Sequence, residues 1–378
     1  MSYTIVTAWY NVREKENHPL KSSEKNEFFV CEKDYFKSAK PFLEKPFFMV
    51  IYTEPRYIPL FLMARPKHLH KMTRFIFKDY KDLPLFDRFE EYQQSHREHP
   101  IHNLIQEKFT PLYKFIINQK VHFVKEVIER NPFNTEKFAW MDLRLHCVYD
   151  MSLEETNQAM GLIAPNRVRL MQMSYTDPSE ITNRHDYYYY TRGKLAAGFF
   201  GGEKAPLLKF ADACIREFEN ALSQRLTPTD EMIYSVVVAQ NTELFDPYIG
   251  EYGDCLKNLI RIRDSFHLVF PFLEHVFKIG KHSYTKSICN GLRRAYLQND
   301  IVLDPEKVHR VWFYNYIAHY WLGEKVECIK ILEEYYDISC IREDVKHHIL
   351  SAHNFILDNI KYMNNKSLNE KFGGISRT

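Results

Sequence analysis

The sequence lacks the features that mark several large classes of protein. It contains no apolar run of the roughly 18 residues that a membrane-spanning helix requires, so we expect no transmembrane segment. Its seven cysteines are scattered without a repeated short spacing, which argues against a disulfide framework or a zinc site and favours reduced thiols. The first ten residues show no basic leader before an apolar stretch, so we expect a cytoplasmic protein without a signal peptide.

The chain also lacks an excess of charge of either sign. The chain carries 51 basic and 49 acidic residues, a net charge of +2, and has no basic stripe. No overall field attracts a polyanion, and we expect no nucleic-acid partner. Aromatic residues are abundant instead, with 28 Phe and 25 Tyr. Most of these rings should fill cores, although an exposed ring can stack on a sugar or a base.

Two patterns divide the 378 residues, a length that suits two domains. Up to residue 264, short apolar runs such as residues 4–9, 47–53 and 138–142 alternate with helical stretches. This alternation predicts an α/β domain with a mostly parallel sheet covered by helices on both faces. Residues 265–370 show only helical patterns and predict an all-α domain, and residues 371–378 read as a disordered tail.

The helical part contains one clear hairpin, in which two helices meet at Gly323. The hairpin resembles a tetratricopeptide unit, although a plain helical cap on the first domain is the simpler interpretation. These helices could bind an acceptor or form a homodimer.

The strand that ends at Asp142 is the strongest chemical signal. Ligands of open α/β sheets bind beyond the carboxyl ends of the strands, close to a change in strand order. A strand-end carboxylate is therefore well placed to hold Mg²⁺ or Mn²⁺, which take hard oxygen ligands. An Asp in this position also serves as a helix cap or a turn former, so a structural role is equally open.

The residues around Asp142 carry a family resemblance. Residues 131–142, Asn-Pro-Phe-Asn-Thr-Glu-Lys-Phe-Ala-Trp-Met-Asp, resemble the signature of the HtrL/YibB family, also called the WlaTC family, of proposed glycosyltransferases. Four further blocks match in order: residues 4–10, Asn118-Gln-Lys120, residues 198–202 and residues 230–233. The resemblance covers about residues 3 to 260 and leaves the helical part unmatched.

The family is similar to nucleotide-diphospho-sugar transferases of the GT-A fold. The resemblance therefore implies a GT-A-like domain over residues 1–264 that transfers a sugar from a nucleotide-diphosphate donor to an acceptor hydroxyl of a glycan or glycoconjugate. By the same analogy Asp142 would hold Mn²⁺ or Mg²⁺, and Trp9 or Tyr10 would stack on the nucleotide base. The donor-binding residues implied in this way are Thr7, Ala8, Trp9, Lys120, Asp142, Arg144, Gly198, Gly201 and Gly202.

The motif Asp142-Leu-Arg144 departs from the Asp-x-Asp of GT-A enzymes and from the Asp-x-Gly of the family. Arg144 could contact the diphosphate directly and replace part of the neutralisation that a metal supplies. Equally, Asp142 could bind ribose, or catalysis could have been lost. A non-catalytic carbohydrate- or protein-binding module derived from a transferase fold is therefore the alternative function.

Asp230 and Glu231 begin a predicted helix, where acidic residues suit the helix dipole. The functional interpretation places one of them beside the acceptor, where a carboxylate could take the hydroxyl proton as general base. The sequence does not decide between the two. His96, His99 and His102 recur every third residue, but Pro100 interrupts a regular helix and no Cys joins them, so a solvated connection is expected.

Overall fold

The computed structural model describes residues 3–16, 32–102, 109–145, 151–163, 166–250, 252, 255–260, 266–299 and 301–341. The chain divides into two compact units, Met1–Ile260 and Arg261–Thr378. The first unit is mixed α/β and the described part of the second is helical, as the sequence predicts. The helix predicted over residues 342–362 and the tail predicted over residues 371–378 lie outside the described residues.

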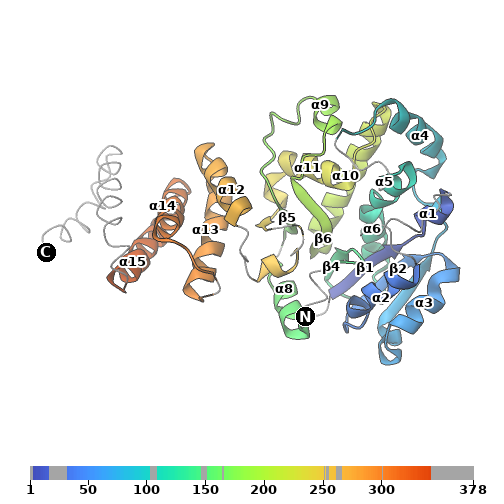
Figure 1. Cartoon of the computed structure of the whole chain (residues 1–378), viewed down its shortest axis with the longest axis horizontal. Helices are drawn as coiled ribbons and strands as arrows, with labels where there is room; N and C mark the ends of the chain where they lie inside the picture. The colour runs from blue at the N-terminus through green and yellow to red at the C-terminus, as the bar shows by residue number, and fades with distance from the viewer. Residues whose placement is uncertain are drawn as a thin grey trace, which may run out of the picture. The chain divides into compact units, whose positions relative to one another are not determined.

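A seven-stranded sheet in the order β3-β2-β1-β4-β6-β5-β7 forms the centre of the first unit (Figure 1). Its parallel pairs are β1 with β2, β1 with β4, β2 with β3 and β5 with β7, whereas β6 is antiparallel to both β4 and β5. The expected mostly parallel sheet is thus confirmed. The strands are β1 (Tyr3–Trp9), β2 (Phe48–Thr53), β3 (Thr73–Phe77), β4 (Lys137–Met141), β5 (Val168–Gln172), β6 (Leu195–Glu203) and β7 (Tyr248–Ile249).

Helices cover both faces of this sheet (Figure 1). The α-helices of the first unit are α1 (Val12–Lys15), α2 (Glu32–Leu43), α3 (Ile58–Ala64), α4 (Phe89–Glu98), α5 (Pro111–Ile117), α6 (Lys120–Arg130), α8 (Leu153–Gly161), α9 (Arg184–Tyr189), α10 (Lys204–Ser223) and α11 (Asp230–Gln240). Short 3-10 helices are η1 (Pro55–Tyr57), η2 (Lys67–Met72), η3 (Tyr80–Asp82), η4 (Phe86–Arg88), η5 (Thr242–Leu244) and η7 (Lys257–Leu259).

Alternation along β4 separates two hydrophobic cores. Phe138 and Trp140 enter the core that α6, α10 and α11 cover, whereas Ala139 and Met141 enter the core that α2, α3 and α8 cover. Successive side chains of a strand point to opposite faces, so a strand buried on both faces must be apolar throughout. This is why the strands appear in the sequence as continuous apolar runs.

The sequence predicts one helix over residues 114–130, but the structure divides it into α5 and α6. Asn118 and Gln119 form a turn between them, in which the Gln119 backbone N–H donates to the Ile116 carbonyl oxygen at 2.9 Å. α6 ends as predicted before Pro132, with Asn131 in the left-handed conformation that closes many helices. The sequence does not predict this break. Asn118, in the turn, and Lys120, at the start of α6, both contact the segment that begins α11.

The second unit contains α12 (Phe266–Lys278), α13 (His282–Leu297), α14 (Pro305–Trp321) and α15 (Lys325–Ile341), which pack in chain order. Gly323, with a φ of +77°, makes the turn between α14 and α15, so the predicted hairpin is present. A partly buried polar network joins three of these helices. Arg293 and the Trp312 indole both donate to the Glu334 carboxylate, at 2.8 and 2.9 Å.

Among the described residues, no helix combines the length and apolar character needed to cross a membrane.

Candidate active site

The strand order reverses beside β1. The chain first adds β2 and β3 on one side of β1 and then places β4 on the other side. The carboxyl ends of β1 and β4 therefore border the crevice in which open α/β sheets bind ligands. Asp142 is the first residue after β4, so its side chain lies at this edge.

Strand β6 runs antiparallel to β4, so the N-terminal end of β6 lies at the same edge of the sheet. The Asp142 backbone N–H donates to the Gly198 carbonyl oxygen at 2.9 Å. On the other side of β6 the register with β5 shifts, since Leu170 pairs with Phe200 and Met171 pairs with Ala196. The residues between, including Ala197, have no partner in the β5 register. This irregularity leaves the Ala197 backbone available to side chains.

Lys120 occupies the centre of the site. Its ammonium nitrogen lies 3.0 Å from a carboxylate oxygen of Asp142, 2.8 Å from one of Asp230 and 3.1 Å from the Ala197 carbonyl oxygen. Lysine has three N–H donors, and three acceptors surround this one. Lys120, Asp142, Ala197, Asp230 and Glu231 are called the Lys120 cluster below.

Burial separates the roles of the two aspartates. The Asp142 side chain is 38% exposed, whereas those of Asp230 and Lys120 are 5% and 8% exposed. The Trp140 indole N–H donates to Asp142 at 2.7 Å and orients the carboxylate. Asp142 is therefore accessible to a solute, whereas Asp230 is the buried partner of Lys120.

Glu231 contacts the backbone of the same residue, Ala197, as Lys120 does. One of its carboxylate oxygens accepts from the Ala197 backbone N–H at 3.5 Å. Asp230 accepts from the Glu231 backbone N–H at 3.0 Å, which fixes the first turn of α11. Burial, followed by the negative charge of Asp230, raises the pKa of Glu231 to about 7. A carboxyl group with this pKa exchanges a proton easily near neutral pH.

The charges of the buried pair depend on each other. Burial opposes the charge of Lys120, but Asp142 and Asp230 outweigh it and raise the pKa of this lysine well above its usual range. Burial raises the pKa of Asp230, although Lys120 acts in the opposite direction. Tyr113 and Tyr234 border this group, and burial raises the pKa of both hydroxyls, with Asp142 and Asp230 adding to the rise.

The turn between α5 and α6 holds the segment that begins α11. The buried Lys114 ammonium donates to the Thr227 carbonyl and hydroxyl oxygens at 2.8 and 2.9 Å. The Asn118 side chain donates to the Pro228 carbonyl oxygen at 3.0 Å. Together with the Lys120–Asp230 pair, these contacts position the first turn of α11, which carries Glu231. Residues 114–120 thus position the carboxylates of α11.

Of the three glycines predicted to bind the donor, the structure brings one to the site. A Cβ on Gly198 would lie 3.6 Å from an Asp142 carboxylate oxygen and 2.9 Å from the Leu145 side chain. Gly201 and Gly202 pair with Ala139 and Phe138, toward the opposite end of β4. A Cβ on Gly202 would meet the Arg167 carbonyl oxygen at 2.8 Å, so close backbone packing accounts for that glycine.

At the end of β1, Thr7 is fully buried and Ala8 is half-buried. The Trp9 ring is 8% exposed and packs against Tyr57 and Phe36, with ring centroids 4.2 and 5.0 Å away. As the structure stands, this ring belongs to the core and presents no free face. Its stacking on a nucleotide base remains a prediction that would require the ring to move.

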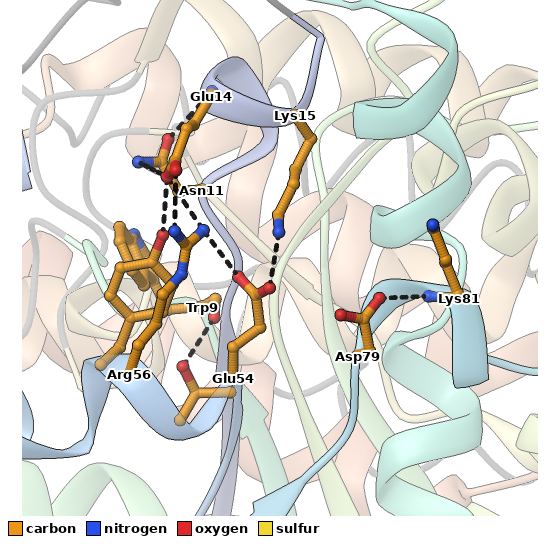
Figure 2. A network of polar contacts seen from close by, with 10 residues as sticks. Trp9, Asn11, Glu14, Lys15, Glu54, Arg56, Asp79 and Lys81 are labelled. Carbon is orange, nitrogen blue, oxygen red and sulfur yellow. Dashed lines mark hydrogen bonds and ion pairs between the residues drawn. The ribbon is translucent and has the colours of Figure 1, made fainter.

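Figure 2 shows a charged network that covers the ends of β1 and β2. Arg56 donates two hydrogen bonds to the Glu14 carboxylate, at 2.7 and 2.9 Å, and contacts Glu54 at 3.4 Å. Lys15 closes the network at 2.7 Å from Glu54. These partners lie up to 42 residues apart in the chain, so the sequence carries no local signal for the network.

Arg144, which replaces the expected glycine, lies half-buried beyond Asp142. Its guanidinium carbon is 5.3 Å from the centre of the Tyr35 ring, and that ring in turn contacts Trp9. Arg144 is therefore linked through Tyr35 to Trp9, the last residue of β1. Its contact with a diphosphate remains a prediction.

Sequence reasoning missed Trp140, Ala197 and Lys114 as members or supports of the site. Trp140 could have been found, because residues two apart on a strand share a face and Trp140 precedes Asp142 by two. Gly198 within an apolar strand could have indicated an irregular ladder, since glycine in a strand often marks one. Lys114 gives no such signal, because its neutral oxygen partners lie more than 100 residues away in the chain.

Among the described residues, no group of three or more His, Cys, Asp and Glu side chains could by itself hold a metal ion. The three histidines that recur at every third residue have different surroundings. Burial lowers the pKa of His96 to about 4, His99 packs against His185, and His102 packs against two tyrosines. Of the two aspartates in the Lys120 cluster, Asp142 is the more exposed and is the candidate ligand. A cation there would need the remaining ligands from a bound solute and water.

Comparison with known families places the whole α/β unit in one of them. A family model described as "Bacterial protein of unknown function (HtrL_YibB)" matches residues 2–261, a range that contains every residue of the Lys120 cluster. A comparison with curated proteins finds no match.

Proposed function

This chain belongs to the HtrL_YibB family, and from that premise and the geometry of the Lys120 cluster we propose that it is a glycosyltransferase. The reaction transfers a sugar from a nucleotide-diphosphate donor to an acceptor hydroxyl of a glycan or glycoconjugate. The nucleoside diphosphate is the leaving group, and the acceptor hydroxyl loses its proton.

One observation carries this proposal: three carboxylates and one ammonium group converge where the strand order reverses. Asp142 is accessible, Asp230 is neutralised by Lys120, and Glu231 has a pKa of about 7. Titratable groups with perturbed pKa values in a ligand-binding crevice are typical of catalytic sites. A purely structural cap of α11 would need neither the buried lysine nor the carboxylate of β4.

The sheet supports a GT-A-like assignment of the fold. A parallel sheet with one reversed strand next to β4, and an acidic residue directly after β4, agrees with the nucleotide-sugar transferase architecture that the family resemblance implies. Fold alone does not determine function, so the proposal rests on the cluster.

Glu231 is the better general base of the two acidic residues that begin α11. The Asp230 side chain is 5% exposed and paired with Lys120, so it is less accessible to an acceptor hydroxyl than the half-buried Glu231 is. Among the described residues, the Glu231 carboxylate accepts one long hydrogen bond, from the Ala197 N–H, and its pKa is close to neutral. In the proposed reaction the Glu231 carboxylate takes the proton of the attacking hydroxyl and becomes a neutral acid.

Asp142 is proposed to face the diphosphate and to provide the protein ligand of Mg²⁺ or Mn²⁺. Mg²⁺ often binds through one or two carboxylates and completes its shell with substrate phosphates and water, which fits a site with one accessible Asp. When bound, the cation would neutralise charge on the leaving diphosphate. Lys120 holds the Asp142 carboxylate in place, and Arg144, two residues further along the chain, is proposed to contact the same phosphates.

Calorimetric titration of nucleotide-diphosphate sugars tests the donor site. We expect at least one of a panel of UDP-, GDP-, ADP- and dTDP-sugars to bind, more tightly with Mn²⁺ than without it. Asp142→Ala should abolish the Mn²⁺-dependent part. Asp212→Ala is the matched control, because it removes an exposed carboxylate paired with Lys125 at 2.6 Å outside the site.

Two results would contradict the proposal. Unchanged Mn²⁺-dependent binding in a folded Asp142→Ala protein would remove this residue from the donor site. Failure of the wild-type chain to bind any donor, with or without Mn²⁺, would favour the alternative of a non-catalytic binding module.

A further inference from the structure

The run Tyr187-Tyr188-Tyr189-Tyr190 is not used by the proposed donor site, and its four rings differ sharply in burial. Tyr187 and Tyr188 are buried at the end of α9, and the Tyr188 hydroxyl donates to Glu217 at 2.7 Å. Tyr189 and Tyr190 are instead 44% and 43% exposed. Two rings therefore anchor the segment while the next two project into solvent.

A third ring joins the exposed pair from a distant part of the chain. The His102 backbone N–H donates to the Tyr189 carbonyl oxygen at 2.7 Å, and a β-bridge joins His102 to Tyr190. The His102 ring lies 4.9 Å from the Tyr189 ring and 5.5 Å from the Tyr190 ring, and the two tyrosine rings are 4.7 Å apart. His102, Tyr189 and Tyr190 form what is called the ring platform below.

The ring platform is tied to the strand that enters the Lys120 cluster. Ala197 follows Tyr190 by seven residues, a separation of at most roughly 24 Å. The connecting segment is held firmly, since the Lys194 carbonyl oxygen accepts from the Met173 and Ser174 N–H groups and its ammonium contacts Glu180 at 3.0 Å. The platform thus keeps a fixed place within the reach of a short oligosaccharide that enters the site.

We propose that the ring platform binds sugar residues of the acceptor glycan, an inference that rests on the proposed transferase function. A pyranose has an apolar C–H face and a rim of hydroxyl groups. The platform offers matching chemistry, with apolar ring faces and with tyrosine hydroxyls and imidazole nitrogens that exchange hydrogen bonds. The platform itself contains no carboxylate, ammonium or guanidinium group, so a neutral glycan is the occupant that fits it.

Binding of neutral tetrasaccharides to the full-length protein tests the inference. The probes are maltotetraose, chitotetraose and mannotetraose, followed by saturation-transfer NMR and calorimetry. We expect the wild-type chain to bind at least one of them and the double variant Tyr189→Ala/Tyr190→Ala to bind it about tenfold or more weakly, because two stacking faces are lost. The control Tyr189→Phe/Tyr190→Phe retains both faces and should bind within about threefold of wild type.

Either of two outcomes overturns the inference: no binding of any tetrasaccharide to the wild-type chain, or equal binding by the Ala/Ala variant. Nucleotide-sugar binding by the same variants separates this failure from failure of the transferase proposal. Intact donor binding together with platform-independent glycan binding would overturn the platform alone. Platform-dependent glycan binding without any donor binding would overturn the transferase proposal alone.

Discussion

At the scale of single residues, Glu231 differs from the two aspartates of the Lys120 cluster. Among the described residues, Lys120 forms ion pairs with Asp142 and Asp230 but not with Glu231. Within the described part of the chain, Lys120 contacts Asp142, Asp230 and the Ala197 carbonyl oxygen, while the Glu231 carboxylate accepts from one backbone N–H. Burial beside Asp230 therefore favours its protonated form. The pKa of about 7 that results is the property a general base needs near neutral pH.

This pKa predicts the acid side of the pH profile. Glu231 must be ionised to accept a proton, so kcat/KM for nucleoside diphosphate release should rise with pH and level off above about 7. Glu231→Gln should lower kcat/KM by about 10²–10⁴-fold, the usual contribution of a general base. Stopped-assay rates between pH 5.5 and 8.5 check both points. A wild-type rate in Glu231→Gln would exclude the role.

Lys120 predicts a difference in stability between two ion pairs. Lys120→Met leaves Asp230 buried without a countercharge and should lower the free energy of unfolding by about 3–5 kcal/mol. The matched change Lys125→Met removes the exposed pair with Asp212 and should cost less than about 1 kcal/mol. Urea unfolding at pH 7 measures both variants. Equal losses would mean that the buried pair contributes no more than a surface pair.

At the scale of elements, the α5–α6 turn determines where α11 begins. Lys114 is fully buried against the neutral oxygens of Thr227, and burial lowers its pKa to about 7. The folded protein therefore binds this proton more weakly than the unfolded chain, whose lysines titrate near 10.5. The resulting penalty is fully present below pH 7 and is relieved as the pH rises from 7 toward 10.5.

The Lys114 penalty predicts that alkaline pH stabilises the wild-type chain relative to Lys114→Met. The free energy of unfolding of wild type minus that of the variant should increase between pH 7 and pH 9, by at most about 1.4 kcal/mol per pH unit. Taking the difference removes titrations that both proteins share, including that of Glu231. Urea unfolding at the two pH values measures it, and a difference independent of pH would contradict the buried, weakened ammonium group.

Some elements could be predicted from the sequence and others could not, for a physical reason. Strands buried on both faces, such as β1 and β4, are apolar throughout and are visible as runs. The break between α5 and α6 follows from contacts of Asn118 and Lys120 with residues about 110 positions later, which no local window contains. The sequence predicts Lys120, Asp142 and Asp230 as site residues, but for the same reason it does not predict that Lys120 pairs with both carboxylates.

At the scale of the whole molecule, a net charge of +2 means that local groups, and not overall repulsion, dominate stability near neutral pH. Two histidines of the α/β unit illustrate this. Burial lowers the pKa of His96 and of His122 to about 4, against an unperturbed value of 6.5. The unfolded chain therefore binds these protons more tightly than the folded chain does.

These two histidines predict acid sensitivity. Stability should be unaffected by them above pH 6.5 and should fall as the pH drops from 6.5 toward 4, by up to about 1.4 kcal/mol per pH unit for each histidine. The double variant His96→Gln/His122→Gln should lose less stability over this range than wild type does. Thermal unfolding at pH 6.5 and pH 5 compares the two proteins, and parallel losses would show that other groups control acid unfolding.

Composition and pattern predicted the architecture of the whole chain, an α/β unit followed by helices. Burial on both faces of a sheet, or on one face of a helix, determines the spacing of apolar residues along the whole element. The contacts that form the site are harder to predict from the sequence. The Arg56 network and the ring platform join residues from separate segments, and their members look like ordinary charged or aromatic residues when read one segment at a time.

The central claim is that the Lys120 cluster is a transferase centre, and release of nucleoside diphosphate tests it most directly. The full-length chain is incubated with a panel of nucleotide-diphosphate sugars and Mn²⁺, and the diphosphate released is measured for wild type, Asp142→Ala and the control Asp212→Ala. The account predicts release from at least one donor by wild type and by Asp212→Ala, and none above background by Asp142→Ala. Wild-type release by a folded Asp142→Ala protein, or no release from any donor, would contradict it.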